Sequence, residues 1–580
     1  MSPVTRNIHK DSQQTNKRMN VSLVVLLIVT VFVVMKTASL QIFSFFAYDK
    51  VVSSKNCIKI SDKSERGDIL DRNKKQIATS MKTFNLYVMK PAMKSAASVA
   101  EVVSSAGILS YSDVLNRLNS RMSYIPISYD IPEQAAFQLK NKYPSIIVKE
   151  EKTRFYLNPH MYSNVTGFVG VDNNGLEGIE YLYNDNLKGK NGYVIYQKKP
   201  NGKIYKHPSY SDKPSEKGED IILTIDKDFQ EIAYNIVREW CEKYNALKGS
   251  AIVMEVETGE IFAMVDYPTY NSNLHGKENP QICKNTSVVN LFEPGSIFKL
   301  IPAVSAIENK LVRLDETCKY ESDTIKINGK RITDAHDLGI LTFEEAFTLS
   351  SNIGFSIIGE KVGKENVYKT AQKFGIGKKT GINVPGEQRG FFTNYEKWIP
   401  IHFANICFGQ GLSVTALQMI CAYNAIANGG VYVNPKLVKS VGSSMLFKNT
   451  EKRIVSDDVA STMNELLKKV IYEGTGVKAQ VDGITVAGKT GTAEKASEKG
   501  GYMRGKYISS FIGYFPADKP RFIVMTIVDE PKGMYWASEI AAPMFADIVK
   551  RIVNLPDYRY ILIESKERAE NEARKDNKQS

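Results

Sequence analysis

A serine and a lysine three positions apart are the first residues of this chain whose spacing suggests catalysis. Pro294 and Gly295 punctuate the chain just before Ser296, and the apolar positions that follow recur at helical spacing. The sequence therefore predicts that Ser296 lies at the N-terminus of a helix, where unpaired backbone amides favour developing negative charge. Lys299 should emerge on the same face about one turn later.

This pair does chemistry only under particular conditions. A serine hydroxyl is a weak nucleophile and needs a neighbouring base to take its proton. Lys299 can be that base only if desolvation or a second cation lowers its pKa. Taken alone, the spacing is weak support, because a capping serine and a surface lysine produce it by chance in a lysine-rich chain.

Two further short sequences change the interpretation of this pair. A helical pattern over residues 341–362 carries Ser350, Ser351 and Asn352. Farther along, a strand-like run ends in Lys-Thr-Gly-Thr at residues 489–492. A glycine in a strand is a natural place for a ligand to approach the backbone. Each sequence is weak singly, but the three occur in an order and in contexts that fit one another.

A second Lys-Thr-Gly sequence, at residues 379–381, also follows the Ser-Ser-Asn sequence. It lies in residues 374–387, a segment punctuated by Gly and Pro with no strand pattern leading into it. We therefore expect a surface loop there, and we assign Lys489 rather than Lys379 to the site.

The elements that must position these residues belong to a region with mixed patterns. Residues 220–226 predict a strand, residues 227–243 an amphipathic helix, and residues 249–268 two strands joined by a turn at 257–259. From there to about Leu555, helical and strand patterns mix without regular βαβ repetition, so α+β is the expected fold class.

The rest of the chain divides by pattern. Residues 50–220 alternate short strand-like runs with Gly, Asn and Pro turns, which indicates an extended, strand-containing region. The last residues are almost devoid of apolar side chains and predict a solvated tail. The expected boundaries are a head at 1–18, an anchor at 19–42, an extended domain at 50–220, a catalytic domain at 221–555 and a polar tail at 556–580.

An apolar run near the N-terminus predicts a membrane anchor. Residues 20–35 are almost unbroken in apolar side chains, and from Met19 to about Ile42 the run could span a bilayer, which takes roughly 20 residues. No convincing small-x-small cleavage site follows, so we expect an uncleaved anchor rather than a signal peptide. Lys36 can extend its ammonium group to an interface. Aromatic residues that could form an interfacial belt come next: Phe43, Phe45, Phe46 and Tyr48.

The composition limits the classes of protein that fit the chain but does not identify one. The chain has 580 residues, 43% of them hydrophobic, and a net charge of +13. The basic residues are scattered and form no nucleic-acid-binding motif, so we expect no nucleic-acid partner. The cysteines are widely spaced and resemble small buried apolar residues rather than disulfide partners: Cys57, Cys241, Cys283, Cys318, Cys407 and Cys421.

Ser-x-x-Lys, Ser-x-Asn and Lys-Thr-Gly in this order resemble the motif set of penicillin-binding proteins and serine β-lactamases. The region before them resembles the pedestal of class B penicillin-binding proteins. Residues 66–73 match its Arg-Gly-x-Ile-x-Asp-Arg-Asn-Gly motif, except that Lys74 stands where Gly is usual, and residues 175–192 match a second block. Residues 407–430 match a block of the transpeptidase domain, and residues 509–531 are most similar to the division-specific and sporulation branch.

The resemblance implies roles for the first two motifs. Ser296 would attack the penultimate D-Ala carbonyl carbon of a stem peptide and form an acyl-enzyme, with Lys299 as the general base. Ser350 would relay a proton toward the leaving group. Asn352 would hold the substrate amide and orient Lys299.

It also implies roles for the strand. Lys489 and the hydroxyls of Thr490 and Thr492 would bind the carboxylate of the substrate or of a β-lactam, and Gly491 would allow close backbone approach. The backbone amides of Ser296 and Thr492 would form the oxyanion hole. The resemblance implies no metal and no organic cofactor, and the six histidines form no ligand-like cluster.

The implied protein is a monofunctional peptidoglycan D,D-transpeptidase, anchored once in the bacterial cytoplasmic membrane with its large domain outside. Its partners would be stem peptides, β-lactam antibiotics, a membrane glycosyltransferase of the SEDS family and other division proteins. Septal wall synthesis is favoured, and an elongation-specific transpeptidase is the alternative.

Other kinds of protein fit less well. A class A penicillin-binding protein would carry a glycosyltransferase domain where this chain has its pedestal, and a β-lactamase would have neither pedestal nor anchor. A non-catalytic division scaffold or β-lactam sensor would not need the intact motifs. For Arg66, Asp71 and Arg72 of the pedestal we expect a structural salt-bridge network rather than a catalytic role.

Overall fold

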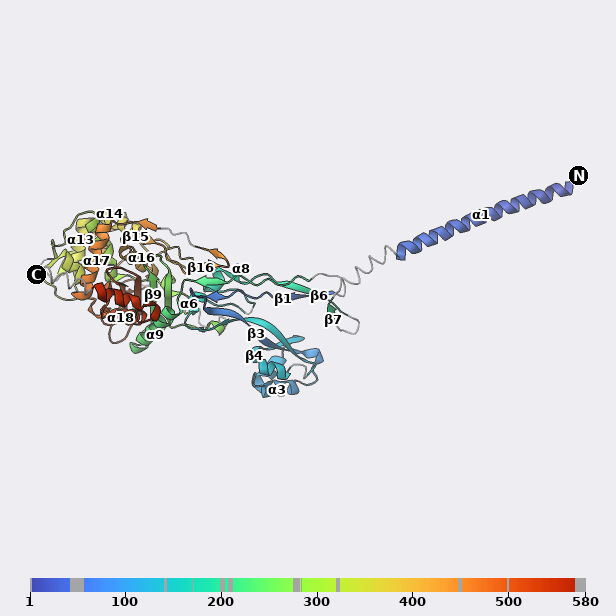
Figure 1. Ribbon diagram of the computed structural model, residues 1–580, viewed down its shortest axis with the longest axis horizontal. Coiled ribbons are helices and arrows are strands. Elements are labelled where there is room, and N and C mark those ends of the chain that lie inside the picture. The colour runs from blue at the N-terminus through green and yellow to red at the C-terminus, as the bar shows by residue number, and fades with distance from the viewer. Residues whose placement is uncertain are drawn as a thin grey trace. The chain divides into compact units, whose positions relative to one another are not determined.

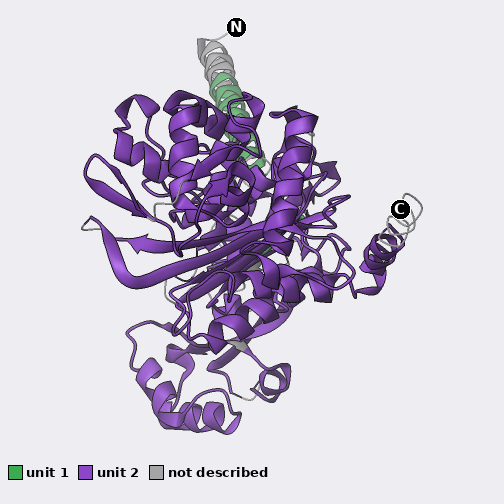
Figure 2. Ribbon diagram, turned by 90° about the vertical axis from the view of Figure 1, so that its left-hand side faces the viewer, with its two compact units in different colours: residues 1–64, 190–216 green, residues 65–189, 217–580 purple. Residues whose placement is uncertain are grey.

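The computed structural model of the chain describes two compact units. The described residues are 3–41, 57–139, 143–170, 172–198, 204–206, 212–274, 282, 284–319, 324–446, 451–497 and 500–568. The first unit comprises residues 1–64 and 190–216, and the second comprises residues 65–189 and 217–580 (Figure 2). Every residue with a predicted catalytic role lies in the second unit.

The first unit contains a long helix and a small sheet. Helix α1 (Pro3–Ser39) includes Thr15–Ser39, a stretch of 25 residues that is long and apolar enough to cross a membrane, with a mean hydropathy of 2.5 over an 18-residue window. The predicted span at 19–42 overlaps this stretch, and the predicted aromatic belt at 43–48 lies outside the described residues. The antiparallel sheet has the order β1-β6-β7: β1 (Cys57–Asp62), β6 (Gly192–Lys198) and β7 (Ile204–Lys206).

A seven-stranded sheet forms the N-terminal part of the second unit, in the order β17-β16-β8-β2-β3-β4 with β5 also paired to β3. Along β3, Leu86 and Val88 point to the same face because side chains alternate in a strand, and they join a core with Val99, Val103 and Val114 from covering helices. The strands are β2 (Ile69–Leu70), β3 (Gln76–Met89), β4 (Tyr124–Ile131), β5 (Ile146–Tyr156), β8 (Ile221–Leu223), β16 (Val438–Val441) and β17 (Ser444–Met445), and the helices are α3 (Ala96–Ser105), α4 (Tyr111–Leu118) and α5 (Glu133–Leu139).

A buried ion-pair network supports this region. Arg66 and Arg154 both pair with Glu180 at 2.6 Å, and all three side chains are fully shielded from solvent. Arg72 pairs with Glu260 at 3.1 Å. Both motif arginines, Arg66 and Arg72, therefore form the ion pairs expected of a structural role. The Arg66 pair is fully buried, so breaking it would leave an uncompensated charge, whereas the Arg72 pair is partly exposed.

The catalytic region is built on a five-stranded antiparallel sheet in the order β10-β9-β21-β20-β19. In β9, Ala251 and Val253 pack in one core with residues of α9 and α18, whereas Ile252 and Met254 pack in the core that contains α11 and α16. Helices therefore cover both faces (Figure 1). The elements are β9 (Lys248–Glu255), β10 (Ile261–Tyr267), β19 (Ala487–Ala496), β20 (Tyr502–Phe515), β21 (Phe522–Asp529), α9 (Lys227–Lys243), α11 (Leu300–Glu308), α16 (Ala416–Ala427) and α18 (Ala541–Ile552).

The predicted helix at 227–243 and the two strands that flank the turn at 257–259 are confirmed. Smaller elements complete the second unit: α6 (Ser163–Thr166), α7 (Gly178–Leu182), α8 (Asn184–Leu187), α10 (Thr286–Val289), β11 (Thr317–Lys319), β12 (Thr324–Ile327), β13 (Lys330–Thr333), β14 (Leu341–Thr342), α12 (Phe343–Thr348), α13 (Asn352–Val362), α14 (Lys364–Lys373), α15 (Pro400–Cys407), β15 (Val431–Val433), β18 (Glu451–Arg453) and α17 (Asp457–Tyr472).

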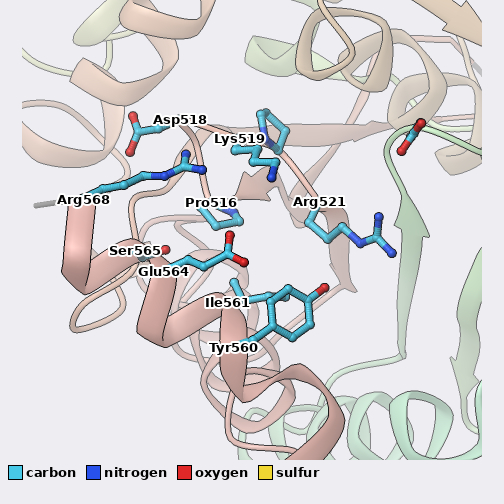
Figure 3. Close-up of a pocket in the computed structure, with 11 residues that line it drawn as sticks. Pro516, Asp518, Lys519, Arg521, Tyr560, Ile561, Glu564, Ser565 and Arg568 are labelled. Carbon is cyan, nitrogen blue, oxygen red and sulfur yellow. The ribbon is translucent and has the colours of Figure 1, made fainter.

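Within the expected polar tail at 556–580, the structure describes residues 556–568, and these form no solvated tail. A short helix at Pro556–Tyr558 continues as helix to residue 568, and Ile561 is only 3% exposed. This segment folds as a helix because Tyr558, Ile561 and Leu562 recur at helical spacing and pack on the core under the sheet. Between this helix and the turn from β20 to β21 lies a charged pocket of about 160 Å³, which Figure 3 shows with Arg521, Glu564 and Arg568 on its wall.

Candidate active site

The Ser-x-x-Lys sequence lies in a tight turn that leads into α11. Its first turn is the 3-10 helix η4 (Gly295–Lys299), so the predicted helix is present but begins more tightly wound than expected. Gly295 has a φ of 54° and donates its backbone N–H to Gly409 O at 3.0 Å. Ser296 is half-buried, so its hydroxyl is held in place and remains open to a substrate.

Lys299 is fully buried and joins the first two motifs. Its Nζ lies 3.1 Å from Ser296 Oγ, 2.6 Å from the backbone oxygen of Ser350, 3.3 Å from Ser350 Oγ and 2.9 Å from Asn352 Oδ1. A general base must lie within hydrogen-bond reach of the proton that it takes. Lys299 satisfies this condition for the hydroxyl of Ser296.

The electrostatics also favour a basic role for this lysine. Loss of solvation lowers the pKa of Lys299 well below the usual lysine value, the positive charge of Lys489 lowers it further, and Asp334 opposes both. The neutral amine, whose lone pair can accept a proton, is therefore more accessible than in an ordinary exposed lysine.

The Ser-Ser-Asn sequence lies in a break between two helices, which corrects the continuous helical pattern expected over residues 341–362. Helix α12 ends at Thr348, and α13 begins at Asn352. Ser350 between them has a φ of 64°, a left-handed conformation that costs of order 1 kcal/mol or more for a residue other than glycine. Ser351 caps α13 with its side chain. The break directs both oxygen atoms of Ser350 toward the buried lysine.

The third motif lies on a strand, as predicted, but near the start of that strand rather than at its end, because β19 begins at Ala487. Lys489 belongs to β19 at the edge of the sheet, is completely buried, and has no hydrogen-bond partner for its Nζ among the residues that the structure describes. Burial lowers its pKa to about 7. A buried cation without a partner is costly, and the carboxylate of a ligand would supply one.

The glycine and the second threonine of this motif have separate tasks. A Cβ on Gly491 would lie 3.0 Å from Ile297 Cγ2 and 3.1 Å from Pro294 O, so the glycine lets β19 approach the serine turn closely. The space that a Cβ at position 491 would fill is therefore taken by the serine turn of the protein itself, not by a ligand. Thr492 Oγ1 accepts a hydrogen bond from Ala537 N at 3.0 Å, which leaves the hydroxyl proton free for a ligand.

Two residues outside the motifs hold the motif residues in place, and sequence reasoning missed them. Thr475 Oγ1 lies 2.6 Å from Thr490 Oγ1. Asp334 accepts a hydrogen bond from Ser351 Oγ at 2.7 Å. Thr475 and Asp334 lie 15 and 17 positions from these partners, too far for helix or strand periodicity to relate them, so no local pattern in the sequence pointed to them.

The second Lys-Thr-Gly sequence lies in a loop, as predicted. Lys379 is exposed, whereas Thr380 is buried and donates from its backbone N and its Oγ1 to Glu387 Oε1 at 2.6 Å. Glu387 thereby closes the loop on itself. The four cysteines whose side chains are described are free and buried, as expected: Cys241, Cys318, Cys407 and Cys421.

The chemistry available to this site is acyl transfer through serine, because a candidate nucleophile and a candidate base lie within hydrogen-bond distance and the charge of Lys489 acts on the same base. Comparison with known proteins identifies the class. Residues 249–550 match the penicillin binding protein transpeptidase domain, and residues 61–223 match the penicillin-binding protein dimerisation domain. The chain belongs to the penicillin-binding proteins of class B, and it is a peptidoglycan D,D-transpeptidase.

Relatives with names cover most of the chain. Stage V sporulation protein D of Bacillus subtilis is 33% identical over 506 residues, which are 84% of this chain and 77% of that protein. Peptidoglycan D,D-transpeptidase FtsI of Escherichia coli is 29% identical over 509 residues, 85% of each chain. The crystal structure of penicillin binding protein 3 of Mycobacterium tuberculosis in complex with aztreonam has a TM-score of 0.65 and 27% identity, covering 85% of this chain and 96% of that one. These relatives agree with the predicted division and sporulation branch.

Proposed function

We propose that the transpeptidation of this enzyme proceeds through acylation of Ser296. The observation that carries the proposal is the 3.1 Å distance from Lys299 Nζ to Ser296 Oγ, combined with the lowered pKa of Lys299. Ser296 Oγ bonds to the carbonyl carbon of the penultimate D-Ala while its proton passes to Lys299. The peptide C–N bond then breaks, and the departing D-Ala amine takes up a proton by way of Ser350. The amine of a neighbouring stem peptide next attacks the ester and releases Ser296.

The remaining motif residues bind and orient the substrate in this proposal. Asn352 holds the substrate amide and keeps Lys299 in position. Lys489 attracts the substrate carboxylate, and the hydroxyls of Thr490 and Thr492 hydrogen bond to it. The backbone amides of Ser296 and Thr492 stabilise the tetrahedral oxyanion, where loss of one donor typically costs about 3–4 kcal/mol.

Reaction with benzylpenicillin tests the assignment of the nucleophile. The β-lactam carbonyl should acylate Ser296, and the adduct should persist for minutes or longer. Intact-protein mass spectrometry should show one drug-sized mass increment in the wild-type protein and none in Ser296→Ala. An increment retained by Ser296→Ala would place the nucleophile elsewhere, and rapid hydrolysis with many turnovers would indicate a β-lactamase.

We also propose where the enzyme works. Helix α1 anchors the chain once in the bacterial cytoplasmic membrane, with a head at 1–18 inside and the pedestal at 50–220 and transpeptidase domain at 221–555 outside. The length and hydropathy of Thr15–Ser39 support the anchor. The sporulation and FtsI relatives support septal rather than elongation wall synthesis. As partners we propose a SEDS-family glycosyltransferase and other division proteins.

A further inference from the structure

A carboxylate from outside the three motifs supports the Ser-Ser-Asn turn. Asp334 directly follows strand β13, and its side chain is only 3% exposed. Its Oδ1 accepts hydrogen bonds from the backbone N of Asn352 and, at 3.1 Å, of Ile353, and its Oδ2 accepts one from Ser351 Oγ at 2.7 Å. One carboxylate therefore satisfies the first two amides of α13, which have no partner within the helix.

The residue before Asp334 fixes the side chain of Asn352. Thr333 O accepts a hydrogen bond from Asn352 Nδ2 at 3.2 Å. Because the amide nitrogen points to Thr333, the amide oxygen points the other way, to Lys299 Nζ at 2.9 Å. The end of β13 thus holds Asn352 by both its backbone and its side chain.

We propose that Asp334 is a positioning residue for acylation: by holding the first turn of α13, it keeps the amide oxygen of Asn352 and the backbone oxygen of Ser350 on Lys299. This inference rests on the proposed role of Lys299 as the base for Ser296. Asp334 does not touch the reacting atoms and acts only through the turn and through its charge.

The charge of Asp334 adds an electrostatic effect. Two ionisable groups influence Lys299 from different elements: Lys489 on β19 lowers the pKa of Lys299, and Asp334 raises it. A third cation, Lys319 on β11, lies 4.0 Å from Asp334 and is anchored on Gly339 O at 2.8 Å. Removing the negative charge should therefore make Lys299 lose its proton at a lower pH.

Two substitutions separate geometry from charge. Asp334→Asn keeps an oxygen for the amides of α13 and removes the charge, whereas Asp334→Ala removes both. Stopped-flow acylation of the full-length protein with a fluorescent penicillin gives the binding constant K and the acylation rate constant k2 separately, with active sites counted by titration. We expect k2 per active site to fall about tenfold or more in Asp334→Ala while K changes by less than about threefold, since the carboxylate-binding residues lie on β19.

Asp334→Asn should recover most of k2 and should shift the acid limb of the pH profile of k2/K to lower pH. The matched control is Asp315→Asn, which removes a carboxylate paired with Arg313 on the surface and should leave both constants unchanged. The proposal is wrong if both Asp334 variants keep the wild-type k2 per active site, or if they lose only titratable sites, as an unstable protein would. A wild-type protein that is not acylated on Ser296 would instead refute the proposed function.

Discussion

Burial lowers the pKa of two lysines of the site, Lys299 and Lys489. The lower pKa favours the proposed role of Lys299 as a base and opposes the proposed role of Lys489 as a cation. Lys299 must be neutral to accept the proton of Ser296, and its pKa is lowered well below the usual value. Lys489 must be charged to attract a carboxylate, and its pKa is lowered to about 7. Loss of the Lys489 proton should therefore weaken the attraction of a carboxylate, whereas loss of the Lys299 proton should allow this lysine to act as a base.

An alkaline limit on acylation follows from Lys489. The ratio k2/K for benzylpenicillin reports the free enzyme, so it should fall above a pH of about 7 as Lys489 loses its proton, and the lowered pKa of Lys299 should move the acid limb to lower pH than an ordinary lysine would give. Stopped-flow acylation between about pH 5 and pH 9 measures this profile. In Lys489→Arg the alkaline limb should disappear, because a guanidinium stays charged. A wild-type rate that keeps rising to the top of this range would contradict the assignment of Lys489.

The two Lys-Thr-Gly sequences provide a matched pair of substitutions. Lys489→Ala removes the buried cation and should slow acylation a hundredfold or more, if roughly 3 kcal/mol of charge-assisted stabilisation is lost. Lys379→Ala removes an exposed side chain and should acylate within about twofold of wild type. Stopped-flow kinetics measures both, and circular dichroism checks that each variant is folded. The reverse ranking would mean that the catalytic strand is misassigned.

At the scale of elements, the pedestal turn after β2 contains a residue in a conformation that suits glycine. Lys74 is exposed and has a φ of 63°, in the sequence position where the related pedestal motif has Gly. The turn is otherwise well held, since Asp71 Oδ1 accepts hydrogen bonds from Asn73 N at 2.8 Å and Lys75 N at 2.7 Å. Asp71 thus supports a turn, which refines the expectation that it would join a salt-bridge network.

Replacing this lysine should stabilise the protein. Lys74→Gly relieves a left-handed conformation that costs roughly 1–2 kcal/mol in a residue with a Cβ, and the greater freedom of glycine in the unfolded chain offsets about half of that gain. We expect the free energy of unfolding to rise by up to about 1 kcal/mol, measured by denaturant titration. Lys75→Gly is the control in the same turn and should lower it. Equal destabilisation by both variants would show that the conformation at position 74 carries little strain.

Over the whole molecule, the apolar helix and the large folded unit predict a definite topology. We expect residues 1–18 to be cytoplasmic and everything beyond about Tyr48 to lie outside, because long domains translocate largely regardless of flanking charge. Protease added to intact spheroplasts should digest the large domain, and a cytoplasmic protein serves as the control for lysis. Full protection of the domain would overturn the topology. A mature protein that begins after Lys36 would overturn the anchor.

The sequence by itself determined which residues are candidates for the chemistry and which elements carry them. The positions of Ser296, Lys299 and Lys489 follow from short motifs in a set order, and the helix at 227–243 and the strand at β19 follow from periodicity. These features depend on neighbours a few positions away, so a local pattern encodes them. The loop around Lys379 could be predicted for the same reason, because the Gly and Pro residues that indicate a loop lie within the segment itself.

Only the tertiary structure decided how these residues work together. The pattern over 341–362 predicts one helix because its apolar positions recur on both sides of Ser350. In the structure the helix is broken at Ser350, and Asp334 accepts hydrogen bonds from the first backbone amides of the second helix. The pKa values of Lys299 and Lys489 both depend on burial, and that of Lys299 also depends on the charge of Lys489, on an element far away in the chain. Both effects act through space over a few ångströms, and distance along the sequence does not encode them.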